Sequence, residues 1–117
     1  MRRIMLRSKI HRARVTGTLL GYEGSIALDE SLMDAAGMLP HEQVQVLNLA
    51  TGARLTTYII KADRESGTVM LNGPAARLAE PGDEIIILTY GDLGEEEALT
   101  HQPCIVHVDE TNRLCLP

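Results

Sequence analysis

Short β-rich segments, separated by turn signals, run through most of this 117-residue chain. They are rich in β-branched residues or alternate apolar with polar positions, which is typical of strands. They cover residues 3–6, 9–15, 25–28, 44–49, 54–62, 68–71, 84–90 and 105–108. Turn-forming sequences, such as Glu65-Ser66-Gly67, separate most of them. Strands spaced this closely predict a mainly β fold that closes into a small barrel, because closure removes exposed sheet edges.

Two short stretches are expected to be helical. Asp29 or Ser31 can cap a helix over residues 32–36, which ends at Gly37. Residues 95–99 form a second, acidic candidate. With 44% apolar and 23% charged residues, the chain has the composition of a soluble globular protein. Its length suits a single domain over residues 1–117, small enough that oligomerisation would add stability.

The basic residues gather at the amino-terminal end of a chain whose net charge is −5. Six of the eleven lie in the first fourteen positions, namely Arg2, Arg3, Arg7, Lys9, Arg12 and Arg14. Such a cluster fits a nucleic-acid patch or a basic strand beside a pocket for a small anion. The chain has no Phe and no Trp for base stacking, and acidic groups dominate from Glu23 onward. A nucleic-acid partner is therefore the less favoured interpretation.

Neither a membrane segment nor a metal site is expected from the sequence. No apolar run has membrane-spanning length, and the first residues lack the apolar core of a secretory signal, so a cytoplasmic location is predicted. Cys104 and Cys115 do not have the spacing of metal ligands and are expected to be reduced, packed thiols rather than a disulfide framework.

The Gly24-Ser25 step could be a site where the chain cuts itself. A serine hydroxyl can attack the carbonyl of the preceding residue and turn the amide into an ester. Elimination of that ester leaves dehydroalanine, which hydrolyses to a pyruvoyl group. Glycine suits the attacked position because it has no Cβ to restrict the backbone or cover the carbonyl. A Gly-Ser pair by itself is also ordinary turn chemistry.

The motifs around Gly24-Ser25 favour the cleavage interpretation. In order along the chain they are residues 9–16, 22–25, 34–37, Asn48, 51–54, 57–58, 71–73, 75–76 and 81–83. Together they resemble the pyruvoyl-dependent aspartate α-decarboxylases of bacteria, from the first residues to about Thr89 and less specifically through the tail. The resemblance implies a six-stranded double-psi β-barrel with short helices, assembled as a homotetramer. It also implies self-cleavage into residues 1–24 and 25–117.

The implied activity is decarboxylation of L-aspartate to β-alanine, which feeds pantothenate and coenzyme A biosynthesis. In this family a pyruvoyl group made from the residue at Ser25 forms a Schiff base with the substrate. It accepts the electrons left on Cα, so no PLP and no metal are required. The resemblance makes Gly24, Ser25 and Thr57 processing residues. Thr57 and Lys9 are also implied to bind substrate.

Arg54 and Tyr58 each have a functional and a structural interpretation. A guanidinium can hold a carboxylate through two parallel hydrogen bonds, whereas an arginine beside a hairpin turn is more often simply exposed. Its match to the family motif Thr-Gly-x-Arg favours substrate binding. Tyr58 is the expected proton donor to Cα after CO2 leaves, although tyrosine in an Ile- and Thr-rich strand usually packs. For His11 a structural role is the more probable one.

Asn72-Gly73 begins a turn that, in the family, approaches the substrate. Asn72, Gly73, Pro74 and Ala75 are therefore substrate-binding candidates. Pro74 stands where the family often has Ala, and proline has no N–H. Backbone donors must then come from Gly73, Ala75 or the following residue.

Strand geometry separates two of these candidates. Alternate residues share a face, so Arg54 and Tyr58 would point the same way, whereas Thr57 would point to the opposite face. If all three act in one pocket, either a local irregularity or a pocket shared between two subunits is needed.

Two other functions stay open beside aspartate decarboxylation. One is a catalytically idle barrel that binds a small anion or a protein, because fold alone never settles function. The other is a pyruvoyl decarboxylase of a different amino acid such as glutamate, since one methylene changes discrimination by only roughly 10 to 200 fold. The sequence also leaves open whether cleavage needs a helper protein.

Overall fold

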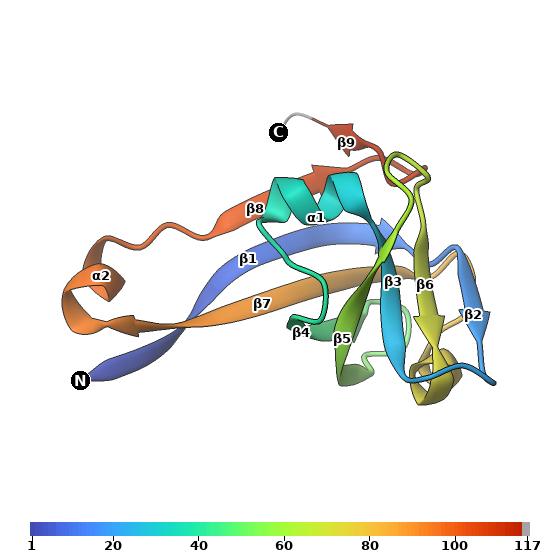
Figure 1. The fold of residues 1–117 in the computed structure, drawn as a ribbon, viewed down its shortest axis with the longest axis horizontal. Helices are drawn as coiled ribbons and strands as arrows, with labels where there is room; N and C mark the ends of the chain where they lie inside the picture. The colour runs from blue at the N-terminus through green and yellow to red at the C-terminus, as the bar shows by residue number, and fades with distance from the viewer. Residues whose placement is uncertain (116–117) are drawn as a thin grey trace.

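The computed structural model describes residues 1–115, and most of them lie in strands. The strands are β1 (Arg2–Arg14), β2 (Gly17–Leu19), β3 (Ser25–Asp29), β4 (Gln43–Asn48), β5 (Arg54–Ala62), β6 (Val69–Asn72), β7 (Glu84–Gly94), β8 (Cys104–Val108) and β9 (Leu114–Cys115). The helices are α1 (Glu30–Ala36), α2 (Glu95–Thr100) and a 3-10 helix, η1 (Gly73–Leu78). The mainly β class with short helices is confirmed (Figure 1), although the described residues form nine strands rather than six.

The strands follow one another across the sheet in the order β2-β6-β3-β5-β4-β7-β1-β8-β9. Segments 3–6 and 9–15, expected as separate strands, form the single long strand β1. Its pairing with β7 shifts between Leu6 and Ser8 and again between Ile10 and Ala13. Such bulges displace the alternation by one residue, which in sequence looks like a strand end.

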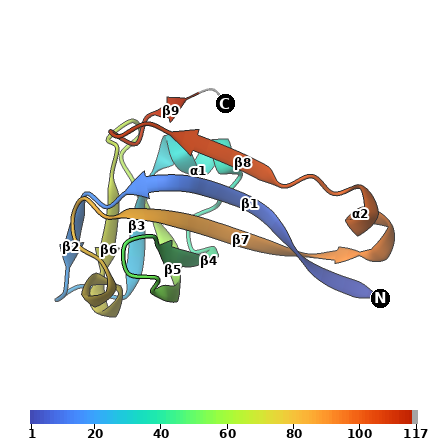
Figure 2. The same cartoon turned by 180° about the vertical axis from the view of Figure 1, so that it is seen from behind.

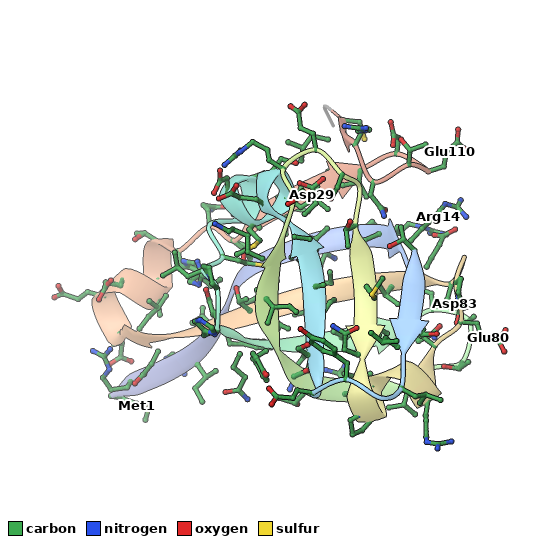
Figure 3. The ribbon with its side chains drawn as sticks, turned by 45° about the vertical axis from the view of Figure 1, so that its right-hand side comes forward. Met1, Arg14, Asp29, Glu80, Asp83 and Glu110 are labelled. Atoms are coloured by element: carbon green, nitrogen blue, oxygen red, sulfur yellow. The ribbon has the colours of Figure 1, made fainter. Side chains whose placement is uncertain are left out.

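One half of the long β1–β7 pair forms an arm that projects from the body of the molecule, with α2 beyond the end of β7 (Figures 1 and 2). Met1 lies at the tip of this arm, whereas Arg14 and Asp83 lie at the opposite end of the molecule (Figure 3). On the arm, Arg2 Nε lies 3.3 Å from Asp92 Oδ1, and both side chains are well exposed. Within residues 1–115 there is no helix with the length and apolar character needed to cross a membrane.

A single buried core lies within the curved sheet. Its fully buried side chains include Ile10, Ile26, Ile59, Leu71 and Ile87, which come from five different strands. A backbone hydrogen bond also joins the segment after β1 to β6: Thr16 N donates to Val69 O at 2.7 Å.

Strand β3 lies between two strands that follow each other directly in sequence, with β5 parallel on one side and β6 antiparallel on the other. This placement determines the surroundings of the Gly24-Ser25 step. The end of β6 leads straight into η1, where a simple turn was expected over residues 72–74. Proline at the start of a helix is favourable, because its missing N–H has no intrahelical partner there.

The two expected helices are confirmed. Asp29 caps α1 by accepting a hydrogen bond from Ser31 N, and Gly37 ends the helix with φ 68°. Positive φ is open to glycine at no steric cost, which makes it the usual residue at this position. The cap also fixes the carboxyl end of β3, because Asp29 is the last residue of that strand.

Candidate active site

Ser25 begins β3 and is almost completely buried, with 1% of its surface exposed. Its antiparallel partner on β6 is Asn72, of which 2% is exposed. The scissile step of the sequence prediction therefore lies where a loop becomes a strand. Directly opposite is the point where β6 becomes η1.

Two hydrogen bonds hold the Ser25 hydroxyl. Its Oγ donates to the carbonyl oxygen of Glu23 at 3.2 Å and accepts from Asn72 Nδ2 at 3.1 Å. The other end of the Asn72 amide, Oδ1, is buried without any hydrogen-bond partner. Buried polar groups in proteins are nearly always paired. An orphaned oxygen beside a serine hydroxyl thus marks this point as a candidate reaction centre.

A cavity of about 300 Å³ opens beside this serine. Five residues predicted for the site line it, namely Gly24, Thr57, Tyr58, Pro74 and Ala75. Leu55, Thr56 and Leu78 complete the wall. Sequence reasoning missed these three, although Pro74 at a helix start was a usable signal for the η1 turn that carries Leu78.

The pairing of β5 with β4 is regular from Arg54 to Tyr58. Thr57 lies opposite the buried Val44, and Tyr58 lies opposite the exposed Gln43. The described strand therefore has no bulge that would bring Arg54 to the same side as Thr57. Of the two explanations that strand geometry left open, the local irregularity does not occur in this stretch.

Arg54 and Lys9 do not line the cavity. Arg54 is exposed, and its Nη1 donates to Gln45 Oε1 at 2.7 Å. Lys9 pairs with Leu88 on β7, which in turn pairs with Gln45 on β4. Three strand spacings thus separate Lys9 from β5, roughly 14 Å. Within one protomer, the two predicted cations lie outside the pocket of the predicted serine.

Comparison with known proteins shows the family of this chain. The family model described as aspartate decarboxylase matches residues 1–115. This chain belongs to the aspartate decarboxylase family. The aspartate 1-decarboxylase of Salinibacter ruber is 58% identical over 92% of this chain and 74% of its own length.

Other relatives of the family cover the chain still further. The aspartate 1-decarboxylase of Bordetella avium is 54% identical over 97% of this chain and 93% of its own length. Aspartate 1-decarboxylase 2 of Gloeobacter violaceus is 56% identical over 97% of this chain and 91% of its own length. Among solved structures, the computationally designed protein msDPBB_sym2 aligns with a TM-score of 0.49 at 17% identity, over 76% of this chain and 99% of the designed one.

In this aspartate decarboxylase family member, His11 lies outside the cavity and packs against His107, with ring centroids 6.0 Å apart. Burial lowers the pKa of His11, and the positive charges of Lys9 and Arg12 lower it further. The ring is therefore neutral near pH 7. Its Nδ1 is buried without a hydrogen-bond partner. The sequence did not predict this environment.

Residues 1–115 of this family member contain no group of three His, Cys, Asp or Glu side chains that could hold a metal ion. Both cysteines are free thiols, but the expectation that they are packed is wrong, because both are exposed. Cys104 Sγ lies 3.3 Å from the carbonyl oxygen of Ala35, at the end of α1.

Proposed function

We propose that this chain is a proenzyme that cuts itself between Gly24 and Ser25 and then decarboxylates L-aspartate to β-alanine and CO2. The observation that carries the proposal is the buried Ser25 hydroxyl, held by Asn72 beside a cavity that Gly24 also lines. The family and the activity for which its relatives are named supply the reaction class.

Self-cleavage begins when Ser25 Oγ attacks the Gly24 carbonyl carbon. The C–N bond then breaks, the serine nitrogen takes the proton, and an ester replaces the amide. Loss of the Ser25 Cα proton expels the Gly24 carboxylate and leaves dehydroalanine, which takes up water and releases ammonia to become the pyruvoyl group. Thr57 is the proposed donor to the oxyanion, supported by its place beside Gly24 in the cavity wall.

The surroundings of Ser25 fit a pyruvoyl group. The orphaned Asn72 Oδ1 can accept a hydrogen bond that the proenzyme does not supply. Gly73 follows Asn72 directly and carries a backbone N–H, as does Ala75, which lines the cavity. Pro74 carries none. A pyruvoyl group in this position supplies an electron sink for the pair left on Cα when CO2 departs.

Tyr58 is the proposed proton donor to the substrate Cα. It lines the cavity together with Gly24 and Thr57, so its phenol can serve one face of a substrate bound there. The remaining carboxylate of aspartate needs a cation. We assign that role to Arg54 and Lys9 of a neighbouring protomer in a homotetramer, because within one protomer both lie outside the pocket.

We also propose that the reaction takes place in the cytoplasm, where β-alanine would enter pantothenate biosynthesis. The resemblance leaves open a helper protein for maturation.

Intact-mass analysis of the purified chain tests the proposal. We expect one fragment of residues 1–24 and one of residues 25–117 that is lighter by one ammonia than simple hydrolysis predicts. Incubation of the same sample with L-aspartate should yield β-alanine, and a parallel incubation with L-glutamate tests the other substrate. A chain that stays whole and makes no β-alanine would instead support the idle barrel.

A further inference from the structure

We propose that Gly73 is a positioning residue for self-cleavage, because its missing Cβ leaves the space in which the backbone of residues 22–24 lies. This inference rests on the proposed cleavage and adds to the substrate contact expected of Gly73. It concerns the step in which the Gly24 carbonyl must stay within reach of Ser25 Oγ.

The geometry at Gly73 is exceptionally close. Its φ is +65°, and a Cβ built on it would lie 2.6 Å from the carbonyl oxygen of Tyr22. The same Cβ would lie 2.8 Å from the nitrogen and 2.9 Å from the Cα of Gly24. Non-bonded carbon contacts are favourable only near 3.5–4.0 Å. All three neighbours are backbone atoms, so no side chain can rotate away to make room.

The residues on either side of Gly73 also contact the scissile segment. Asn72 holds Ser25 Oγ through its amide at 3.1 Å. Pro74 Cδ would lie 3.4 Å from a Cβ built on Gly24. The hydroxyl is therefore held by Asn72, whereas the backbone of residues 22–24 lies against Gly73.

A side chain at position 73 would push the two reacting groups apart. Asn72 and Ser25 are paired strand residues within the sheet, whereas residues 20–24 form a loop. The loop would give way first and carry the Gly24 carbonyl away from a hydroxyl that stays in place. A displacement of about 1 Å typically slows a reaction by about 100-fold.

Other glycines of this chain provide matched controls. Gly82 has φ +93° with no atom within 4 Å of a built Cβ, so Gly82→Ala adds backbone strain without a collision. Gly67 has φ +71°, and its built Cβ would lie 2.8 Å from Thr111 O. Gly67→Ala therefore adds both strain and a collision, at a place outside the cavity.

The experiment follows freshly synthesised full-length chains over time by intact mass, with folding checked by circular dichroism. Hydroxylamine is added to parallel samples, because it captures the ester and releases residues 1–24 as a hydroxamate and residues 25–117 with an amino-terminal serine. We expect Gly73→Ala to cleave about 100-fold more slowly and to give correspondingly less captured ester. Gly73→Asn is a second variant, since Asn tolerates positive φ better but carries the same Cβ.

Gly82→Ala and Gly67→Ala should cleave within about threefold of the unmodified chain. A folded Gly73→Ala that cleaves at the unmodified rate would overturn the inference, as would an equal slowing in Gly82→Ala. Unfolding of both Gly73 variants while Gly67→Ala folds would also overturn it, because Gly73 would then act on the fold. If the unmodified chain itself never cleaves, the proposed function fails instead.

Discussion

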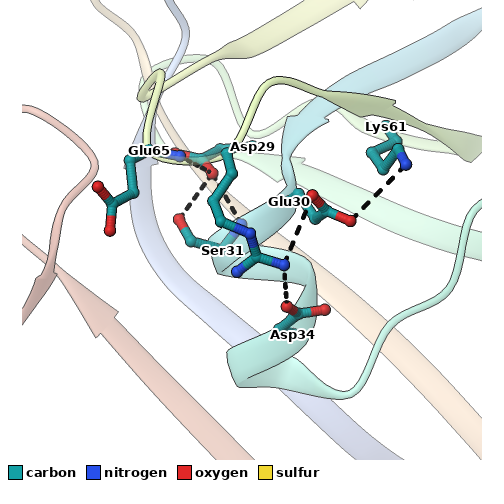
Figure 4. A network of polar contacts seen from close by, with 7 residues as sticks. Asp29, Glu30, Ser31, Asp34, Lys61 and Glu65 are labelled. Carbon is teal, nitrogen blue, oxygen red and sulfur yellow. Dashed lines mark hydrogen bonds and ion pairs between the residues drawn. The ribbon is translucent and has the colours of Figure 1, made fainter.

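The two ends of strand β3 both carry buried polar side chains, but the groups differ in how fully they are hydrogen-bonded. At the carboxyl end, Asp29 accepts four hydrogen bonds. Three come from Ser31 N at 2.8 Å, Ser31 Oγ at 2.6 Å and Glu65 N at 2.9 Å (Figure 4), and the fourth comes from Gly67 N at 2.9 Å. At the amino end, Ser25 and Asn72 share one bond, and Asn72 Oδ1 has no partner.

This difference suggests a structural role for the Asp29 end of β3 and the proposed chemistry at the Ser25 end. The Asp29 carboxylate ties the 63–67 turn to the start of α1 and has no obvious capacity left for a ligand. The Asn72 amide keeps an unused acceptor, which costs stability in the resting chain. In the proposed mechanism, this acceptor is free to bind a group formed later in the reaction.

Substitution of Ser25 should have the largest effect. Ser25→Ala removes the nucleophile, so we expect no cleavage and no β-alanine, measured by intact mass and by product assay. The control is Ser8→Ala, since Ser8 is equally buried and its Oγ lies 2.7 Å from Thr89 Oγ1. Ser8→Ala should lower stability and leave cleavage intact. Cleavage of Ser25→Ala at the same bond would contradict the assignment of the nucleophile.

Loss of the Asn72 amide should come second. Asn72→Ala leaves Ser25 Oγ without the donor that orients it, and misplacement of a reacting group can slow a reaction by about 100-fold. Stability should change little, because the unpaired Oδ1 is removed as well. Cleavage is followed by mass and stability by urea unfolding.

Asn48→Ala is the matched control for that variant. Asn48 is also buried, but its Nδ2 donates to Leu78 O at 3.0 Å and to Asp83 Oδ2 at 2.9 Å, and its Oδ1 accepts from Ala50 N at 2.8 Å. We expect the opposite result, with stability lowered by about 1–3 kcal/mol and cleavage preserved. Equal cleavage rates in the two variants would remove Asn72 from the mechanism.

The amino-acid sequence predicted most of the body of the fold. Alternating apolar positions located β3 to β7, and Asp29 with Gly37 marked the two ends of α1. Strand β2 was missed because its three residues are too few to show a period and pair with β6, some 50 residues further on. The break predicted inside β1 is a bulge, which a period-two pattern cannot distinguish from a strand end.

The sequence predicted the members of the site better than their arrangement. Gly24, Thr57 and Tyr58 meet in one cavity, which motif order alone indicated. Arg54 and Lys9 do not reach it within one protomer, because β5 is regular and β1 lies three strands away. Residue spacing along the chain does not encode the order of the strands in the sheet.

At the satisfied end of β3, Asp29→Asn should destabilise the protein without affecting cleavage. Asp29 Oδ1 accepts three of the four bonds and Oδ2 accepts one, so an amide N–H₂ group in either position leaves at least one buried N–H without its acceptor. Charge-assisted bonds of this kind contribute about 1.5–3 kcal/mol each. We expect the free energy of unfolding to fall by about 2–3 kcal/mol, measured in urea. Slower cleavage at unchanged stability would reverse the contrast between the two ends.

The contribution of Asp29 should also depend on pH. Burial alone raises the pKa of Asp29, but hydrogen bonds from Ser31, Gly67 and Glu65 outweigh it and hold the pKa below its usual value of 3.8. As the pH falls, the Asp29 carboxylate of the unfolded chain therefore takes up a proton before that of the folded chain. The stabilisation by Asp29 is fully present above the unfolded pKa and is lost as the pH falls through the lower pKa of the folded chain. The stability difference between the unmodified chain and Asp29→Asn should be constant above about pH 5 and shrink below about pH 4. A difference that grows as the solution is acidified would contradict this assignment.

The smallest effect is expected at the exposed rim of the same network. Arg64 Nη2 lies 2.5 Å from Asp34 and 3.5 Å from Glu30 (Figure 4), with about half of its side chain in solvent. Water and salt screen such pairs, and holding long side chains in place costs entropy. We expect Arg64→Ala to lower Tm by no more than about 2 °C, a change that disappears in 1 M salt. A loss as large as that of Asp29→Asn would mean that the ion pairs of Arg64, rather than the buried carboxylate, hold the 63–67 turn against α1.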